Sequence, residues 1–152
     1  MAPSVSTHGT AVDHFEENIV TDDRKPSSQP VDDGTTETIT EILDRSVTLV
    51  FNEPDAERRD VLMAATYSTD IVFSDPDGTV IGLDAFAAKI AELLAGSAGL
   101  TFTLCRPVQE STGMGVASWQ LAPAGQPPVV TGTDVALVDN GLVTRMWTLL
   151  DD

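Results

Sequence analysis

The stretch Ile71-Val-Phe-Ser-Asp-Pro-Asp-Gly-Thr-Val-Ile-Gly82 decides how the rest of the chain is arranged. Its first half predicts a short strand in which Ile71 and Phe73 share one face. Asp75 stands at the end of that strand, because Pro76 has no N–H to donate to a neighbouring strand. A carboxylate in this position has two interpretations: it stabilises the turn through nearby N–H groups, or it is a reactive group at the rim of a cavity.

Helical periodicity lies on both sides of this stretch. Apolar residues recur at i, i+3 and i+4 over residues 37–51, which predicts a first helix with one buried face. A second helix is expected from Asp55 to about Tyr67, after the break at Pro54. A third is expected over residues 85–95, capped by Asp84.

After the third helix the period changes from 3.6 to 2. Strands are predicted at residues 71–75, 79–81, 100–105, 114–122, 129–138 and 142–150. Three helices followed mainly by hairpin-connected strands indicate an α+β fold, with the helices on one face of a curved, mainly antiparallel sheet.

Length and charge narrow the classes of protein. The 152 residues are enough for one domain, and 24 acids against 8 bases give a net charge of −16. We therefore expect neither nucleic acid nor an anionic membrane surface as a partner, since both require a basic patch. Residues 1–36 are expected to form a disordered acidic tail and residues 37–152 the folded domain. With no signal-like start and no spanning apolar run, a cytoplasmic location is expected.

The positions of the histidines restrict the chemistry. His8 and His14 both lie in the expected tail, so residues 37–152 contain none. Histidine-dependent nucleophiles and histidine metal sites are thereby excluded from the domain, and the single cysteine, Cys105, excludes an intrachain disulfide and a Cys-rich metal site. Acid–base chemistry would have to use carboxylates, supported by Tyr67, Lys89 or arginine. No metal or organic cofactor is expected.

The last hairpin places a second acid. If Asn140-Gly141 forms a two-residue type I′ turn, Asp134 lies opposite Trp147 and Ala136 opposite Arg145, with all four on one face. Asp134 is then a mid-strand carboxylate beside an aromatic ring and an arginine. A longer loop would shift this register by one residue.

Several short motifs, in this order and spacing, resemble the nuclear transport factor 2-like superfamily and within it the SnoaL-like group, over residues 37–152. They are Phe51-Asn52-Glu53-Pro54-Asp55, Asp75-Pro76, Gly82-Leu83-Asp84-Ala85, Trp119, Gly132-Thr133-Asp134 and Asp139-Asn140-Gly141. The resemblance implies a cone-shaped, cystatin-like fold with a ligand cavity, and a homodimer formed through the outer face of the sheet. The superfamily contains ketosteroid isomerase, epoxide hydrolases, polyketide cyclases and proteins with only a binding role, so the fold does not define the reaction.

The resemblance also implies roles for particular residues. Asp75 matches the general base of ketosteroid isomerase, and Asp134 resembles the second, protonated aspartate that donates to the oxyanion. The tyrosine of that enzyme falls on Val47, which cannot donate a hydrogen bond. We therefore expect cofactor-free isomerase, cyclase or dehydratase chemistry on a small apolar molecule, with Asp75 as the base and Asp134 as a donor or orienting group.

The expected binding residues are Phe73, Tyr67, Trp119, Arg145 and Trp147. Two alternatives stay open at this stage. One is a ligand-binding or dimerising module without catalysis, in which both aspartates are bonded to the backbone. The other is water activation of the epoxide-hydrolase type by Asp75, Asp134 and Arg145.

Overall fold

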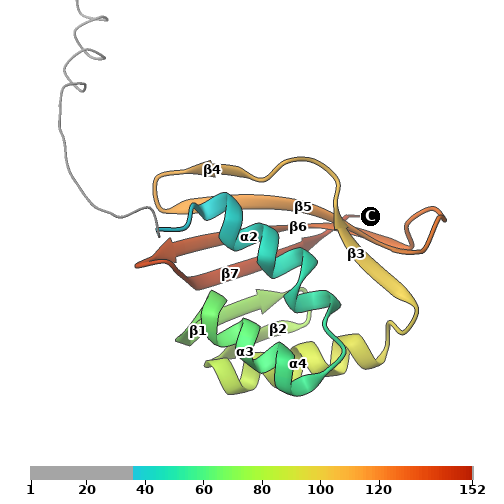
Figure 1. Cartoon of the computed structure of the whole chain (residues 1–152), viewed down its shortest axis with the longest axis horizontal. Coiled ribbons are helices and arrows are strands. Elements are labelled where there is room, and N and C mark those ends of the chain that lie inside the picture. The colour runs from blue at the N-terminus through green and yellow to red at the C-terminus, as the bar shows by residue number, and fades with distance from the viewer. Residues whose placement is uncertain (1–35, 152) are drawn as a thin grey trace, which may run out of the picture. The chain divides into compact units, whose positions relative to one another are not determined.

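The computed structural model describes residues 36–151, so the expected tail lies outside the described residues except for Thr36. Within this range, three α-helices pack on a curved, mostly antiparallel sheet (Figure 1). The α+β class is therefore confirmed. None of the helices described here is long and apolar enough to cross a membrane.

The first two helices begin where the sequence provides caps. Helix α2 spans Ile39–Thr48, and Thr38 and Glu41 form a reciprocal capping box at its start. A short 3-10 turn, η3, follows at Val50–Asn52. Helix α3 spans Ala56–Thr66, with Asp55 accepting a hydrogen bond from the Arg58 N–H.

Helix α4 spans Leu83–Ala95 and differs from the prediction at its start. Its N-cap is Gly82, with φ of 99°, and Asp84 lies inside the first turn instead of capping the helix. The conformation at Gly82 is one that residues with a Cβ rarely adopt, so glycine is what allows the sharp entry into α4. Asp84 still stabilises the helix there, because its negative charge lies at the positive end of the dipole.

The strands form one seven-stranded sheet. They are β1 (Tyr67–Asp75), β2 (Gly78–Ile81), β3 (Leu100–Leu104), β4 (Gln109–Ser111), β5 (Met114–Pro123), β6 (Val130–Asp139) and β7 (Leu142–Leu150). The order is β2-β1-β7-β6-β5-β3, with β4 paired to β5. Only β1 and β7 run parallel, so strands from opposite ends of the chain are neighbours.

The predicted strands differ from the structure in two places. Strand β1 begins at Tyr67, the C-cap residue of α3, and not at Ile71 as expected, and Tyr67 pairs with Val143 of β7 before the strand register shifts. Strand β4 was missed because its three residues are all exposed and have no apolar alternation.

The register of the last hairpin is as predicted only next to its turn. Asn140 and Gly141 have φ of 53° and 79°, as a type I′ turn requires, and Asp139 faces Leu142. A bulge at Thr144 then shifts the pairing by one residue, so Asp134 faces Thr148 and Leu137 faces Arg145. The expected grouping of Asp134 with Arg145 and Trp147 on one face is therefore wrong.

The core lies between the helices and the inner face of the sheet. Its fully buried side chains include Ile42, Leu43, Phe86, Ile90 and Met146. Gly115 of β5 allows α2 to approach the sheet, since a Cβ there would lie 2.6 Å from a side-chain carbon of Ile39.

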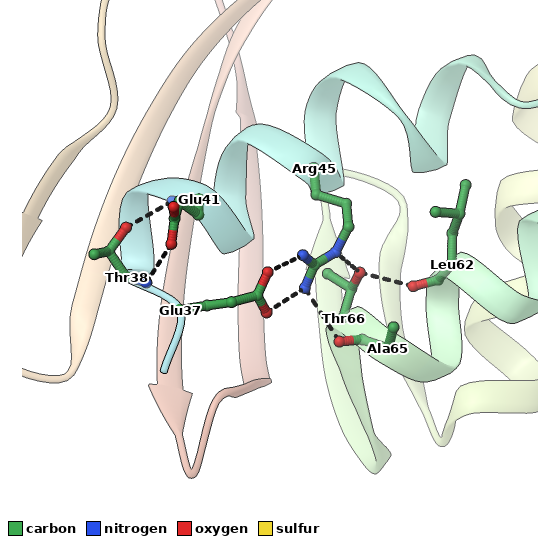
Figure 2. A network of polar contacts seen from close by, with 7 residues as sticks. All are labelled: Glu37, Thr38, Glu41, Arg45, Leu62, Ala65 and Thr66. Atoms are coloured by element: carbon green, nitrogen blue, oxygen red, sulfur yellow. Dashed lines mark hydrogen bonds and ion pairs between the residues drawn. The ribbon is translucent and has the colours of Figure 1, made fainter. Parts of the chain in front are cut away.

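Arg45 fixes the position of α2 relative to the end of α3 (Figure 2). Its guanidinium forms an ion pair with Glu37 and donates to the Thr66 hydroxyl at 2.9 Å and the Ala65 carbonyl at 3.2 Å. Thr66 in turn donates to the Leu62 carbonyl. The otherwise unpaired carbonyl at the C-terminal end of α3 is thus satisfied by a cation, the charge that this end of a helix favours.

Candidate functional site

A cavity of about 250 Å³ opens between the helices and the inner face of the sheet. Most of its lining is apolar, and three carboxylates provide its ionisable groups. The lining residues come from α2, η3, β1, the turn after β1, α4, β3, β5, β6 and β7: Val47, Phe51, Phe73, Asp75, Pro76, Asp77, Leu93, Phe102, Trp119, Leu121, Val130, Asp134, Thr148 and Leu150.

Asp134 is the buried acid of this cavity, with 5% of its surface exposed. Its Oδ1 accepts hydrogen bonds from Trp119 Nε1 at 3.0 Å and from Thr148 Oγ1 at 2.7 Å. Oδ2 accepts none from the described residues, so it is the oxygen available to a ligand. Burial raises the pKa of Asp134 to about 6, against the two hydrogen bonds, which lower it.

Gly132 is what allows Trp119 to reach Asp134. A Cβ at position 132 would lie 2.5 Å from Trp119 Cζ2 and 2.6 Å from the Leu149 carbonyl oxygen. Because real Cβ atoms do not approach neighbours so closely, any side chain at this position would displace the indole. The glycine two residues before Asp134 therefore helps to set the hydrogen bond that Asp134 receives.

Asp75 combines both interpretations offered by the sequence. Its Oδ1 accepts a hydrogen bond from the Asp77 N–H at 2.9 Å, which is ordinary turn geometry. Its Oδ2 lies 3.0 Å from Lys89 Nζ of α4, and its side chain also lines the cavity. Asp75 is thus a paired carboxylate, whereas Asp134 forms no ion pair with any residue in the range 36–151.

Three of the residues expected at the site do not line the cavity. Tyr67 is fully buried, and its hydroxyl lies 2.5 Å from Ser46 Oγ. Arg145 and Trp147 lie on the outer face, with the guanidinium carbon 4.2 Å from the centre of the indole ring. The bulge at Thr144 explains this, because a shift of one residue moves alternate side chains to the opposite face.

Only Phe73, Asp75, Trp119 and Asp134 of the lining residues were expected at the site. Among those missed, Thr148 follows from the correct register, since it is the cross-strand neighbour of Asp134. Phe51 and Phe102 lie in apolar segments, and nothing in their spacing distinguishes a cavity wall from packed interior. In the described part of the chain, no three His, Cys, Asp or Glu side chains are grouped so that they could hold a metal ion.

The sequence model of the SnoaL-like domain family matches residues 32–146. The chain belongs to this family. The match covers every element of the cavity except the end of β7. No curated protein matches the chain.

Several solved structures have the same fold as this chain. A provisionally assigned SnoaL-like isomerase from Agrobacterium tumefaciens is 25% identical, with a TM-score of 0.69 over 74% of this chain and 96% of the other. A provisionally assigned SnoaL-like polyketide cyclase from Jannaschia is 19% identical, with a TM-score of 0.60 over 80% and 92%. A provisionally assigned ketosteroid isomerase from Kribbella flavida is also 19% identical, with a TM-score of 0.57 over 74% and 78%. The last two show the fold alone.

Proposed function

We propose that this SnoaL-like chain binds a small apolar molecule in the cavity and catalyses a cofactor-free acid–base step on it. The observation that supports this most directly is Asp134, a carboxylate in an apolar cavity with one oxygen fixed and the other free. Its pKa of about 6 lies close to neutral, where a general base is most effective. The reaction would be of the isomerase, cyclase or dehydratase type.

In the proposed step, Oδ2 of Asp134 accepts a proton from an acidic C–H or O–H of the bound molecule. The Trp119 and Thr148 donors remain on Oδ1 and orient the carboxylate throughout. The apolar walls exclude water, which strengthens the interaction between the carboxylate and the charge that develops on the substrate. The protonated acid can then return the proton to another atom of the same molecule.

This assignment exchanges the roles expected from the sequence for Asp75 and Asp134. Each oxygen of Asp75 already has one partner, the Lys89 ammonium or the Asp77 N–H, and retains a second lone pair for a polar group of a ligand. We therefore propose that Asp75 orients a polar group of the ligand at the rim, and that Phe73 and Trp119 contact the apolar part.

Two of the chemistries considered receive less support from this geometry. An isomerase mechanism that uses a tyrosine hydroxyl as hydrogen-bond donor has no such donor in this cavity. Val47 lines the cavity where the isomerase tyrosine is expected, and the Tyr67 hydroxyl is hydrogen-bonded to Ser46. Water activation of the epoxide-hydrolase type would need Arg145 beside Asp134, but Arg145 donates to Val72 and Ser74 on the outer face.

The proposal can be tested without knowing the natural substrate. The probe is 2-tetralone, an apolar ketone with acidic hydrogens next to its carbonyl, and the measurement is their exchange with deuterium by NMR. The wild type should accelerate exchange, and Asp134→Asn should reduce that acceleration by about 100-fold or more, the usual contribution of a general base. Asp139→Asn, at the exposed last residue of β6, is the matched control and should leave the rate unchanged. Equal rates in the wild type and the Asp134 variant would exclude Asp134 as the base.

We also propose that two copies associate through the outer face of the sheet. Leu137 and Leu149 on this face are 40% and 56% exposed, close to the stacked pair of Arg145 and Trp147. Burying these side chains against a second copy would remove apolar surface from water.

A further inference from the structure

The charges that face the cavity are all negative. Asp75, Asp77 and Asp134 are its ionisable lining residues, and no basic side chain is among the lining residues. Lys89 lies behind the rim, where it pairs with Asp75. Since the whole chain has a net charge of −16, the surrounding field adds to the attraction of cations and the repulsion of anions.

The buried member of this set has no counter-ion. The ion pairs within residues 36–151 involve Glu37, Glu53, Asp75 and Asp77, and none involves Asp134. A buried carboxylate without a cation is unfavourable unless it takes up a proton. A bound cation would supply the missing charge, whereas a bound carboxylate would place a second negative charge next to the first.

The walls beside Asp134 are aromatic rings set nearly at right angles. Phe51 and Phe102 have ring centres 5.5 Å apart and planes at 72°, and Phe102 and Trp119 have centres 5.2 Å apart and planes at 69°. All three rings line the cavity, and a cation that lies over the face of any of them is attracted by its electron density, which favours an alkylated ammonium group. With no metal-binding group of side chains among the described residues, the cation that fits is organic.

We propose that the cavity selects apolar ligands that contain a positively charged nitrogen, held between Asp134 Oδ2 and the rings of Phe51, Phe102 and Trp119, and that it rejects carboxylates. The inference rests on the proposed function only in taking the cavity as the ligand site. It does not depend on proton transfer by Asp134.

The test uses two probes that differ in one atom. Benzyltrimethylammonium is positively charged at every pH, and neopentylbenzene has the same shape with carbon in place of nitrogen. Phenylacetate serves as the anionic comparison. Binding is measured by calorimetry and by tryptophan fluorescence at pH 8, with the wild type, Asp134→Asn and the control Asp139→Asn.

We expect the ammonium to bind at least about tenfold more tightly than its neutral counterpart, since a desolvated cation–π contact contributes about 2 kcal/mol. Phenylacetate should bind most weakly. The preference should be reduced in Asp134→Asn, which keeps the aromatic rings but loses the negative charge, and should be unchanged in Asp139→Asn.

The wild type alone provides a second measurement. Its affinity for the ammonium should fall as the pH decreases through about 6, where Asp134 becomes protonated. The other titratable groups near the ligand are Tyr67, whose pKa is raised by burial so that it stays neutral, and the rim acids Asp75 and Asp77. An affinity that is constant from pH 8 to pH 5 would contradict the inference.

The outcomes separate this inference from the proposed function. Equal binding of the two isosteres, or tighter binding of the neutral one, overturns the charge selection and leaves the cavity as an apolar ligand site. If none of the three probes binds, the cavity is not a ligand site for molecules of this size, and both proposals fail.

Discussion

At the scale of the residue, the state of Asp134 is decided by opposing effects. Removal from water favours the protonated carboxyl, and the donors on Trp119 and Thr148 favour the carboxylate. Desolvation is the larger effect, but the hydrogen bonds keep the pKa near 6, so the group is mostly ionised at pH 7 and can still be protonated. The chain therefore keeps a charge in an unfavourable place, which is common where a site needs reactivity.

This conflict predicts that Asp134→Asn stabilises the protein at high pH. The folded state raises the pKa from 3.8 to about 6, a difference of about 3 kcal/mol, so the wild type loses stability as the pH rises through this window. An amide retains an oxygen for the two donors and has no charge to desolvate. The variant should therefore exceed the wild type by up to about 3 kcal/mol at pH 8 and by little at pH 4.

Urea denaturation at the two pH values measures this difference. Asp139→Asn, which removes the same charge from the exposed end of β6, should show no comparable dependence on pH. If Asp134→Asn is less stable than the wild type at pH 8, the carboxylate must have a stabilising partner in addition to Trp119 and Thr148.

At the scale of the element, β5 and β6 build the site together through Gly132. The glycine leaves space for the Trp119 indole, and Asp134 of the same strand accepts its N–H. Trp119 and Gly132 are cross-strand neighbours, and the indole occupies the space that a side chain at position 132 would need.

Gly132→Ala should displace this indole. The added methyl group would overpack a filled space, at a cost of about 1–3 kcal/mol in unfolding free energy, and would weaken the Trp119–Asp134 hydrogen bond. Denaturation and Trp119 fluorescence in a Trp147→Phe background provide the measurements. Gly96→Ala is the control, because its nearest neighbour atom would be 3.8 Å from the new Cβ. An unaltered Trp119 signal in Gly132→Ala would show that the strands move apart without disturbing the site.

At the scale of the whole molecule, the proposed association places a second copy on the outer face of the sheet. Leu149→Glu places a charge in the middle of the proposed contact, where burial without a partner is costly. Sedimentation velocity should show a dimer for the wild type and a monomer for this variant. Val61→Glu, at a 71% exposed position on α3, is the matched control and should remain dimeric. A wild type that sediments as a monomer at high concentration would contradict the proposed association.

Local patterns were sufficient for most of the elements. Apolar periodicity and the residues that end a helix predicted each of the three helices, and the Asn140-Gly141 turn was correctly predicted from its two residues. The prediction placed the start of β1 at Ile71 and missed Tyr67, which is the C-cap residue of α3 and also pairs with Val143 of the last strand. Pairing between distant segments has no local signature, and the bulge at Thr144 had none either.

The sequence by itself determined that this protein is an α+β chain, because periodicity is a property of neighbouring residues, and that residues 37–152 contain no histidine, so that the proposed acid–base step has to use carboxylates. It also placed Asp75 and Asp134 as the two acids to consider. Only the tertiary structure decided that Lys89 forms an ion pair with Asp75, and that Trp119 and Thr148 donate hydrogen bonds to one oxygen of Asp134. It also decided that Arg145 lies on the outer face of the sheet, away from the cavity. The physical reason is that the pKa of a carboxyl group depends on its burial, and its free lone pairs depend on partners from distant strands. The extra residue at the bulge in β7 changes those partners, because it moves alternate side chains to the opposite face of the sheet.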